Sequence, residues 1–197
     1  GTGHSHLIAE EFYIRAGGLA LVKAILPPEL MLDQMPLKST HLERLEGIAA
    51  VLLELYKVEA GDTLIVVSNS GRNAVPVEMC LEAKKRGVSV VAMTSMKHSG
   101  GCDSRHSSGK KMYQLADVTI DTCADKGDAS FYVEGFDIPI GPPSDAVGIA
   151  IAQAMTCSIV KKLVDDGFEP PVFRSANVDG GDAFNAQLYE KYFGYWK

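Results

Sequence analysis

The apolar and polar positions along the chain predict strands that alternate with helices. Residues 64–67 (Leu-Ile-Val-Val) form an unbroken apolar run rich in β-branched residues, typical of a strand buried on both faces of a parallel sheet. Residues 68–73 are polar, and Val75, Met79 and Leu81 then follow at helical spacing. This stretch therefore predicts a strand, a short polar turn and a helix.

The rest of the chain continues this alternation. Further helices are expected over residues 7–14, 42–56 and 144–164, and further short strands over 19–26, 88–93 and 116–120. A long polar loop is expected over residues 96–110, an edge hairpin or extended flap over 123–143, and a loop or short helix over 29–41. The pattern indicates an α/β fold with a mainly parallel sheet.

Three polar turns are expected at the carboxyl ends of strands, which is where open α/β sheets bind their ligands. They are Gly1–Ser5, Ser68–Asn73 and Thr94–Ser95. The second turn precedes a helix, whose N-terminus attracts anions. It has no lysine and does not match the nucleotide P-loop or the dinucleotide pattern. The sequence therefore favours a phosphate on a smaller molecule, and the alternative is a turn whose hydroxyls cap the next helix.

Composition narrows the possible partners. The chain has 197 residues, of which 46% are hydrophobic, and a net charge of −6 with scattered basic residues, which argues against a nucleic-acid surface. The four cysteines form no C-x-x-C pair and suggest reduced thiols. No apolar run approaches membrane-spanning length and no signal peptide is visible. We therefore expect a cytoplasmic protein with neither a membrane nor a nucleic acid as partner.

The chain begins with a glycine turn, Gly1-Thr2-Gly3-His4-Ser5, of a kind that normally follows a strand. We therefore expect residues 1–197 to form a single domain from which an N-terminal helix and the first strand are missing.

The three turns, in this order, resemble the sugar isomerase (SIS) family of phosphosugar-binding domains, over nearly the whole chain. Arg72-Asn73, the Ser-Arg-His-Ser-Ser-Gly-Lys loop and the Asn-Val-Asp-Gly-Gly-Asp tail are similar to a bacterial subgroup that resembles phosphoheptose isomerases. The resemblance implies a three-layer α-β-α sandwich with a flavodoxin-like doubly wound sheet. It also implies a homodimer or homotetramer with sites between subunits, a sugar phosphate as ligand and no cofactor.

The resemblance also implies a set of binding residues. Ser68, Ser70 and Ser95 would hold the phosphate with the N–H groups of residues 71–73, and Ser5 would lie near the sugar. The full set of expected phosphosugar-binding residues is Ser5, Ser68, Asn69, Ser70, Gly71, Arg72, Asn73, Thr94 and Ser95.

Isomerisation of an aldose to a ketose needs a base and a group that moves the hydroxyl proton. Phosphoheptose isomerases carry a functional glutamate in an Ala-Glu-Glu on the first helix, and Glu10 and Glu11 are similar, about one helical turn closer to the glycine turn. The alternative is that Glu10 and Glu11 are a solvated pair on the surface of an amphipathic helix. We expect Glu43, Glu46 and Glu78 to be mainly surface residues.

The chain departs from phosphoheptose isomerases because residues 144–164 contain no histidine. We expect His106, in a polar loop, to take that role, since its pKa suits proton transfer near neutrality. His98, Cys102 and His106 lack a fourth ligand, so we expect no metal site.

Three functions remain open at this point. The first is a sugar-phosphate isomerase. The second is a non-catalytic phosphosugar sensor, suggested by the missing helix histidine, and the third is a lyase or etherase acting on an amino-sugar phosphate.

Overall fold

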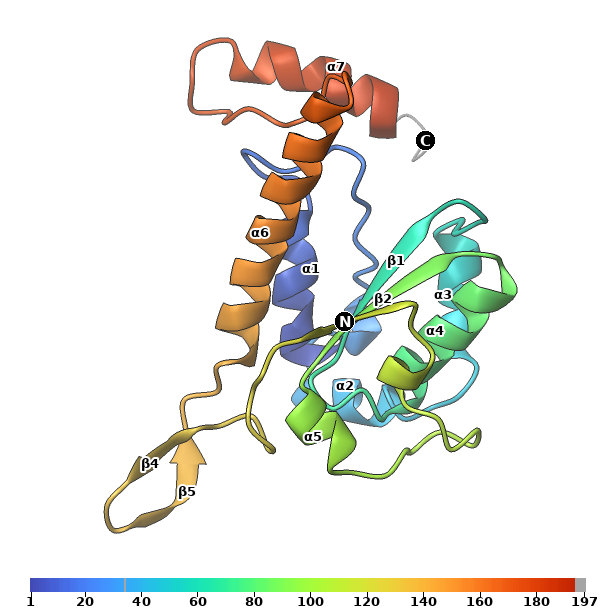
Figure 1. The fold of residues 1–197 in the computed structure, drawn as a ribbon, viewed down its shortest axis with the longest axis vertical. Coiled ribbons are helices and arrows are strands. Elements are labelled where there is room, and N and C mark those ends of the chain that lie inside the picture. The colour runs from blue at the N-terminus through green and yellow to red at the C-terminus, as the bar shows by residue number, and fades with distance from the viewer. Residues whose placement is uncertain (34, 194–197) are drawn as a thin grey trace. The chain divides into compact units, whose positions relative to one another are not determined.

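The structure is a computed structural model that describes residues 1–33 and 35–193, and of Pro36 the backbone alone (Figure 1). The chain divides into two compact units. The first consists of residues 1–6 and 25–148, and the second of residues 7–24 with those from 149 onward. Each unit is described by itself.

The first unit is built on a parallel sheet of three strands in the order β1-β2-β3. The strands are β1 (Thr63–Val67), β2 (Ser89–Thr94) and β3 (Val118–Asp121), and Ala92 at the centre of β2 pairs with Val66 and Thr119. Ala92 and Met93 are fully buried because neighbours cover both faces of β2. Helices flank the sheet (Figure 1). The expected α/β class with a parallel sheet is confirmed.

Short helical elements surround this sheet. They are η1 (Gly3–Ser5), η2 (Pro28–Leu30), α2 (Pro36–Leu42), α3 (Ile48–Leu55), α4 (Ala74–Lys85), α5 (Met96–Gly100) and η3 (Met112–Gln114). The core of the unit contains Leu53 of α3 together with Cys80 and Ala83 of α4, all of them fully buried. The polar turn after β1 is therefore carried on a strand and a helix that are both anchored in the core.

The expected helix over residues 42–56 is wrong as one element, because the chain breaks between α2 and α3. Gly47 has a φ of +97°, a conformation that L-residues rarely adopt, and it is the N-cap of α3. Its N–H group donates to both carboxylate oxygens of Glu78, at 2.9 and 2.8 Å. A side chain from α4 thus stabilises the break.

Residues 96–110 form the expected loop only from residue 101 onward. They begin with α5, whose N-cap Ser95 accepts a hydrogen bond from the N–H of His98. Residues 131–140 form the expected hairpin, with β4 (Phe131–Val133) antiparallel to β5 (Phe136–Ile140). Phe131 and Phe136 are both exposed on it.

The second unit contains most of α1 (His6–Phe12) and α6 (Ser144–Asp165), together with α7 (Gly181–Phe193). The expected strand over residues 19–26 is wrong, since Leu19 forms only an isolated bridge with Val172. The next backbone hydrogen bond, from the N–H of Ala20, ends on the carbonyl of Pro171, and proline has no N–H with which to continue a ladder.

Helix α7 was not expected from the sequence, which indicated only an aromatic tail. Tyr189 and Phe193 of α7 pack on Phe173, with ring centroids 5.1 and 6.1 Å away. Asn185 of the same helix is buried, and its amide exchanges two hydrogen bonds with the backbone of Arg174. Tyr195 and Trp196 of the expected tail lie outside the described residues.

Helix α6 runs for 22 residues and is, by length and composition alone, apolar enough to cross a membrane, which corrects the expectation that no run has this length. A helix at a subunit interface has the same composition. The sequence predicted a helix that is buried on most sides. The side chains of Val147, Ile159 and Val164 on α6 are exposed, so the described part of one chain does not bury the helix to that extent.

Candidate functional site

The turn between β1 and α4 is held from both sides. The N–H of Gly71 donates to the hydroxyl of Ser68 at 3.2 Å, and the carbonyl of Gly71 accepts from the N–H of Met112 at 2.9 Å. Gly71 has a φ of +55°, and a Cβ there would lie 3.2 to 3.3 Å from side-chain atoms of Met112, Ser99 and Thr94. Only glycine fits this close-packed turn without strain.

The N-terminus of α4 has no side-chain cap. Asn73 occupies the N-cap position in extended conformation but makes no capping hydrogen bond. The N–H groups of Ser70, Arg72 and Asn73 find no acceptor among the described residues. Because the first N–H groups of a helix need partners, this 12-residue helix presents donors and the positive end of its dipole at the turn. The alternative drawn from the sequence, in which the hydroxyl groups of the turn cap the next helix, is therefore wrong for α4.

The side chain of Asn73 is used elsewhere. Its Nδ2 donates to Glu43 Oε2 at 2.7 Å, and its Oδ1 accepts from Arg105 Nη1 at 3.0 Å. The backbone N–H of Arg105 donates to the carbonyl of Arg72 at 2.8 Å. A carboxylate and a guanidinium from distant parts of the sequence are thus fixed at the start of α4.

The two cationic side chains of this region are those of Arg72 and Arg105. Burial, followed by the charge of Arg72, lowers the pKa of Arg105. Burial also lowers the pKa of His98, and Arg72 adds to that effect. The Nε of Arg72 is buried with no hydrogen-bond partner in the described chain. The positive potential around the turn suits an anionic ligand.

Thr94 and Ser95 support the turn from the end of β2. Thr94 Oγ1 donates to the carbonyl of Asn69 at 3.1 Å, and the N–H of Ser95 donates to the same carbonyl. The Ser95 hydroxyl donates to the carbonyl of Ala124, and both Thr94 and Ser95 are fully buried. Their hydroxyl groups thus hold backbone in this structure, whereas Ser70 is half-buried and its hydroxyl has no partner in the described chain.

The other expected residues lie elsewhere. Ser5 belongs to η1 in the first unit. Glu10 and Glu11 belong to α1 in the second unit, where Glu10 is exposed and the Glu11 carboxylate contacts Arg15 and Gln153. The structure does not bring these two carboxylates together with the turn within one unit.

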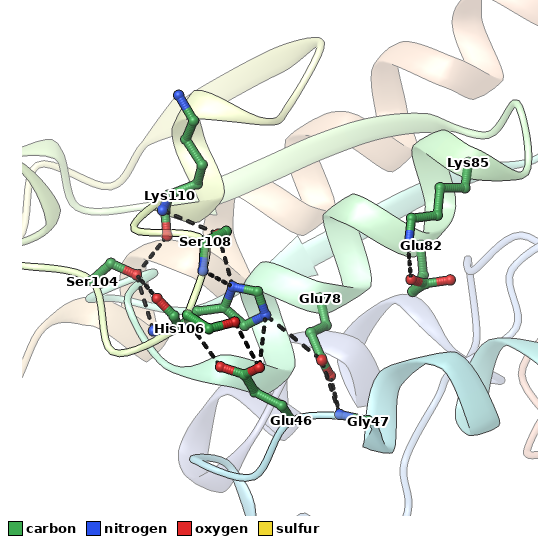
Figure 2. A network of polar contacts seen from close by, with 10 residues as sticks. Glu46, Gly47, Glu78, Glu82, Lys85, Ser104, His106, Ser108 and Lys110 are labelled. Carbon is green, nitrogen blue, oxygen red and sulfur yellow. Dashed lines mark hydrogen bonds and ion pairs between the residues drawn. The ribbon is translucent and has the colours of Figure 1, made fainter.

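His106 lies in a cluster with Glu46 and Glu78, two residues that the sequence placed at the surface (Figure 2). Its Nε2 is 3.8 Å from Glu46 Oε2 and 3.7 Å from Glu78 Oε1, and its side chain is only 6% exposed. Glu46 accepts hydrogen bonds from the N–H and the hydroxyl of Ser107, at 2.7 and 2.8 Å. Residues 46, 78 and 106 show no common spacing, so no sequence signal predicted this cluster.

Comparisons with known proteins place the chain among its relatives. The family model of the SIS domain matches residues 1–95. UPF0309 protein BH3325 of Halalkalibacterium halodurans is 54% identical over 192 residues, which cover 98% of this chain and 79% of that protein. UPF0309 protein TTE0306 of Caldanaerobacter subterraneus is 45% identical, and UPF0309 protein lin2794 of Listeria innocua is 41% identical. Each alignment covers 98% of this chain, with 79% and 78% of the relative.

Proposed function

Because the chain belongs to the UPF0309 family and carries an SIS domain, we propose that it binds a sugar phosphate at residues 68–73 and the N-terminus of α4. The observation that supports this position most directly is the uncapped start of α4, where backbone N–H groups meet no acceptor in the described chain. A phosphate group is the natural partner of such a helix terminus.

We assign the residues of the turn to two roles. Ser70, Arg72 and the N–H groups of residues 70, 72 and 73 contact the phosphate, because these donors are free of other partners in the described chain. Ser68, Asn69, Thr94 and Ser95 keep the turn in shape through the hydrogen bonds described above. Ser5, in η1, remains a candidate for contact with the sugar. The cytoplasm, where sugar phosphates occur, is the proposed location.

The first prediction concerns the two serines of the turn. Replacing Ser70 with alanine removes a hydroxyl donor, and Ser68→Ala removes the acceptor for the Gly71 N–H. Hydrogen bonds to a charged group are worth about 1.5–3 kcal/mol each, so the double variant should bind a hexose 6-phosphate at least about tenfold more weakly. Calorimetry measures this, with Ser89→Ala on β2 as a control. Unchanged affinity in the double variant would contradict the proposed site.

For the reaction, we propose isomerisation of an aldose phosphate to a ketose phosphate. Glu43 is the carboxylate at the turn, since its Oε2 accepts from Asn73 beside the start of α4. Its other oxygen is available to take a proton from the sugar. Glu10 and Glu11 of α1 stay as further candidates for this base. The alternatives are a phosphosugar sensor and a lyase or etherase. A measurement of turnover distinguishes them from an isomerase.

A second prediction concerns assembly. We propose that the protein is a homodimer or homotetramer in which a second copy covers α6, because Val147, Ile159 and Val164 expose apolar surface along this one helix. Apolar surface of this kind is commonly shared in a symmetric interface. Light scattering coupled to size exclusion should give a mass of two or four chains at micromolar concentration. A monomer would contradict the proposal, and Val164→Glu should shift the assembly toward smaller species.

A further inference from the structure

Three side chains from separate segments bring metal-ligand atoms together in the first unit. Glu46 follows α2, Glu78 lies on α4 and His106 lies in the segment after α5 (Figure 2). One ligand atom from each residue lies within 4.8 Å of the other two. The cluster belongs to none of the phosphate contacts proposed above.

The imidazole of His106 is buried and directed at both carboxylates. Its Nε2 lies 3.7 Å from Glu78 and 3.8 Å from Glu46, which exceeds the usual length of a hydrogen bond, about 2.7–3.2 Å. This nitrogen therefore has no hydrogen-bond partner among the described residues, although its side chain is 6% exposed. A polar atom on a side chain that is this deeply buried normally has a partner.

The charges around Nε2 favour a cation. The carboxylate of Glu46 accepts hydrogen bonds from the N–H and the hydroxyl of Ser107. Among the described residues, His106 is the only group within ion-pair distance of either carboxylate. Two carboxylates beside a single imidazole attract a cation.

Each of the three ligands is oriented by a second contact. The N–H of Gly47 holds Glu78, Ser107 holds Glu46, and Ser108 Oγ lies 2.8 Å from His106 Nδ1. Partners of this kind fix the direction of the side chains that bind the ion in metal sites.

We propose that Glu46, Glu78 and His106 bind one divalent first-row transition ion, with water in the remaining positions. Metal–ligand bonds of about 2.0–2.2 Å at tetrahedral angles separate the ligand atoms by about 3.3–3.6 Å. The two distances from Nε2, 3.7 and 3.8 Å, therefore have to contract by only a few tenths of an ångström, and the carboxylate atoms already lie within 4.8 Å of each other. One imidazole and two carboxylates suit Zn²⁺, Mn²⁺ or Co²⁺ better than Mg²⁺ or Ca²⁺, which favour oxygen ligands alone.

Binding would change the tautomer of His106. The N–H of Ser108 donates to Nδ1 at 3.1 Å, so without metal the ring proton is on Nε2. With Nε2 bound to a metal, the ring proton would be on Nδ1, which would then donate a hydrogen bond to Ser108 Oγ, 2.8 Å away, and would no longer accept from the N–H of Ser108.

Titration of metal-stripped protein with Zn²⁺ and with Mn²⁺ in a calorimeter tests the proposal. We expect one ion per chain, with affinity at least tenfold lower in both His106→Ala and Glu78→Gln. The glutamine of the second variant can still accept from Gly47, which preserves the break before α3. Glu82→Gln is the matched control, because Glu82 lies one turn further along α4 and pairs with Lys85 and Arg86. It should bind metal as the unchanged protein does.

The tautomer provides an independent readout. In ¹⁵N NMR spectra, the His106 ring of the unchanged protein should move from the Nε2–H to the Nδ1–H form as Zn²⁺ is added. Absence of saturable binding up to about millimolar metal, or equal affinity in His106→Ala, Glu78→Gln and the unchanged protein, would overturn the proposal. Because the titrations contain no sugar phosphate, their failure would leave the phosphate site untouched.

Discussion

Replacing Gly71 with alanine is expected to lower the affinity for a sugar phosphate by a factor of at least about 30, which corresponds to about 2 kcal/mol. The added Cβ would lie 3.2 Å from Met112 and 3.3 Å from Ser99 and Thr94, in a backbone with a φ of +55°. Forcing an L-residue into this conformation costs about 1–2 kcal/mol. The turn should therefore open and move its N–H groups away from the phosphate.

Gly87→Ala is the control for this variant. Gly87 follows α4 with a φ of +72°, and a Cβ there would lie at an ordinary 3.5 Å from Ala60. Its stability should fall by about 1 kcal/mol in thermal unfolding, because only backbone strain is introduced, and its affinity should not change. Equal affinities in Gly71→Ala and the unchanged protein would mean that the phosphate does not depend on this turn.

Glu43→Gln is expected to lower turnover by a factor of about 10²–10⁴ while leaving binding within about threefold, because general-base catalysis contributes a factor of that size. Glutamine can still accept the hydrogen bond from Asn73 Nδ2, so the turn keeps its geometry. The measurement is exchange of the proton on carbon 2 of an aldose 6-phosphate into deuterium oxide, followed by NMR.

Glu54→Gln, an exposed residue on α3, provides the matched control and should exchange as the unchanged protein does. Normal exchange in Glu43→Gln together with its loss in Glu11→Gln would assign the base to α1. If the unchanged protein binds the sugar phosphate and catalyses no exchange of this proton, isomerisation is contradicted and the sensor or the lyase takes its place.

The sequence predicted the sheet well because its signal is local. The apolar runs of β1 and β2 are buried or half-buried, and such strands differ plainly from the polar turns that follow them. Polar residues at the carboxyl ends of two adjacent strands also led to the predicted ligand site, which stays a prediction. These features depend on neighbouring residues alone.

Features that depend on distant contacts were missed. The break at Gly47 is stabilised by Glu78, and the cluster around His106 joins residues that are 28 to 60 positions apart in the sequence. The sequence also assigned Ser95 to the phosphate, but its hydroxyl group caps α5 and reaches Ala124. No periodicity or motif records such pairings, since they arise only when the chain is folded.

The central claim, that a sugar phosphate binds at the start of α4, is tested most directly by mapping amide chemical shifts of ¹⁵N-labelled protein. A hexose 6-phosphate is titrated in, and the same hexose without phosphate serves as the reference. We expect saturable, phosphate-dependent shifts that are largest at the N–H groups of Ser70, Arg72, Asn73 and Ala74, because these donors would gain an acceptor. Saturable shifts at other residues, with these four amides unmoved, would contradict the claim.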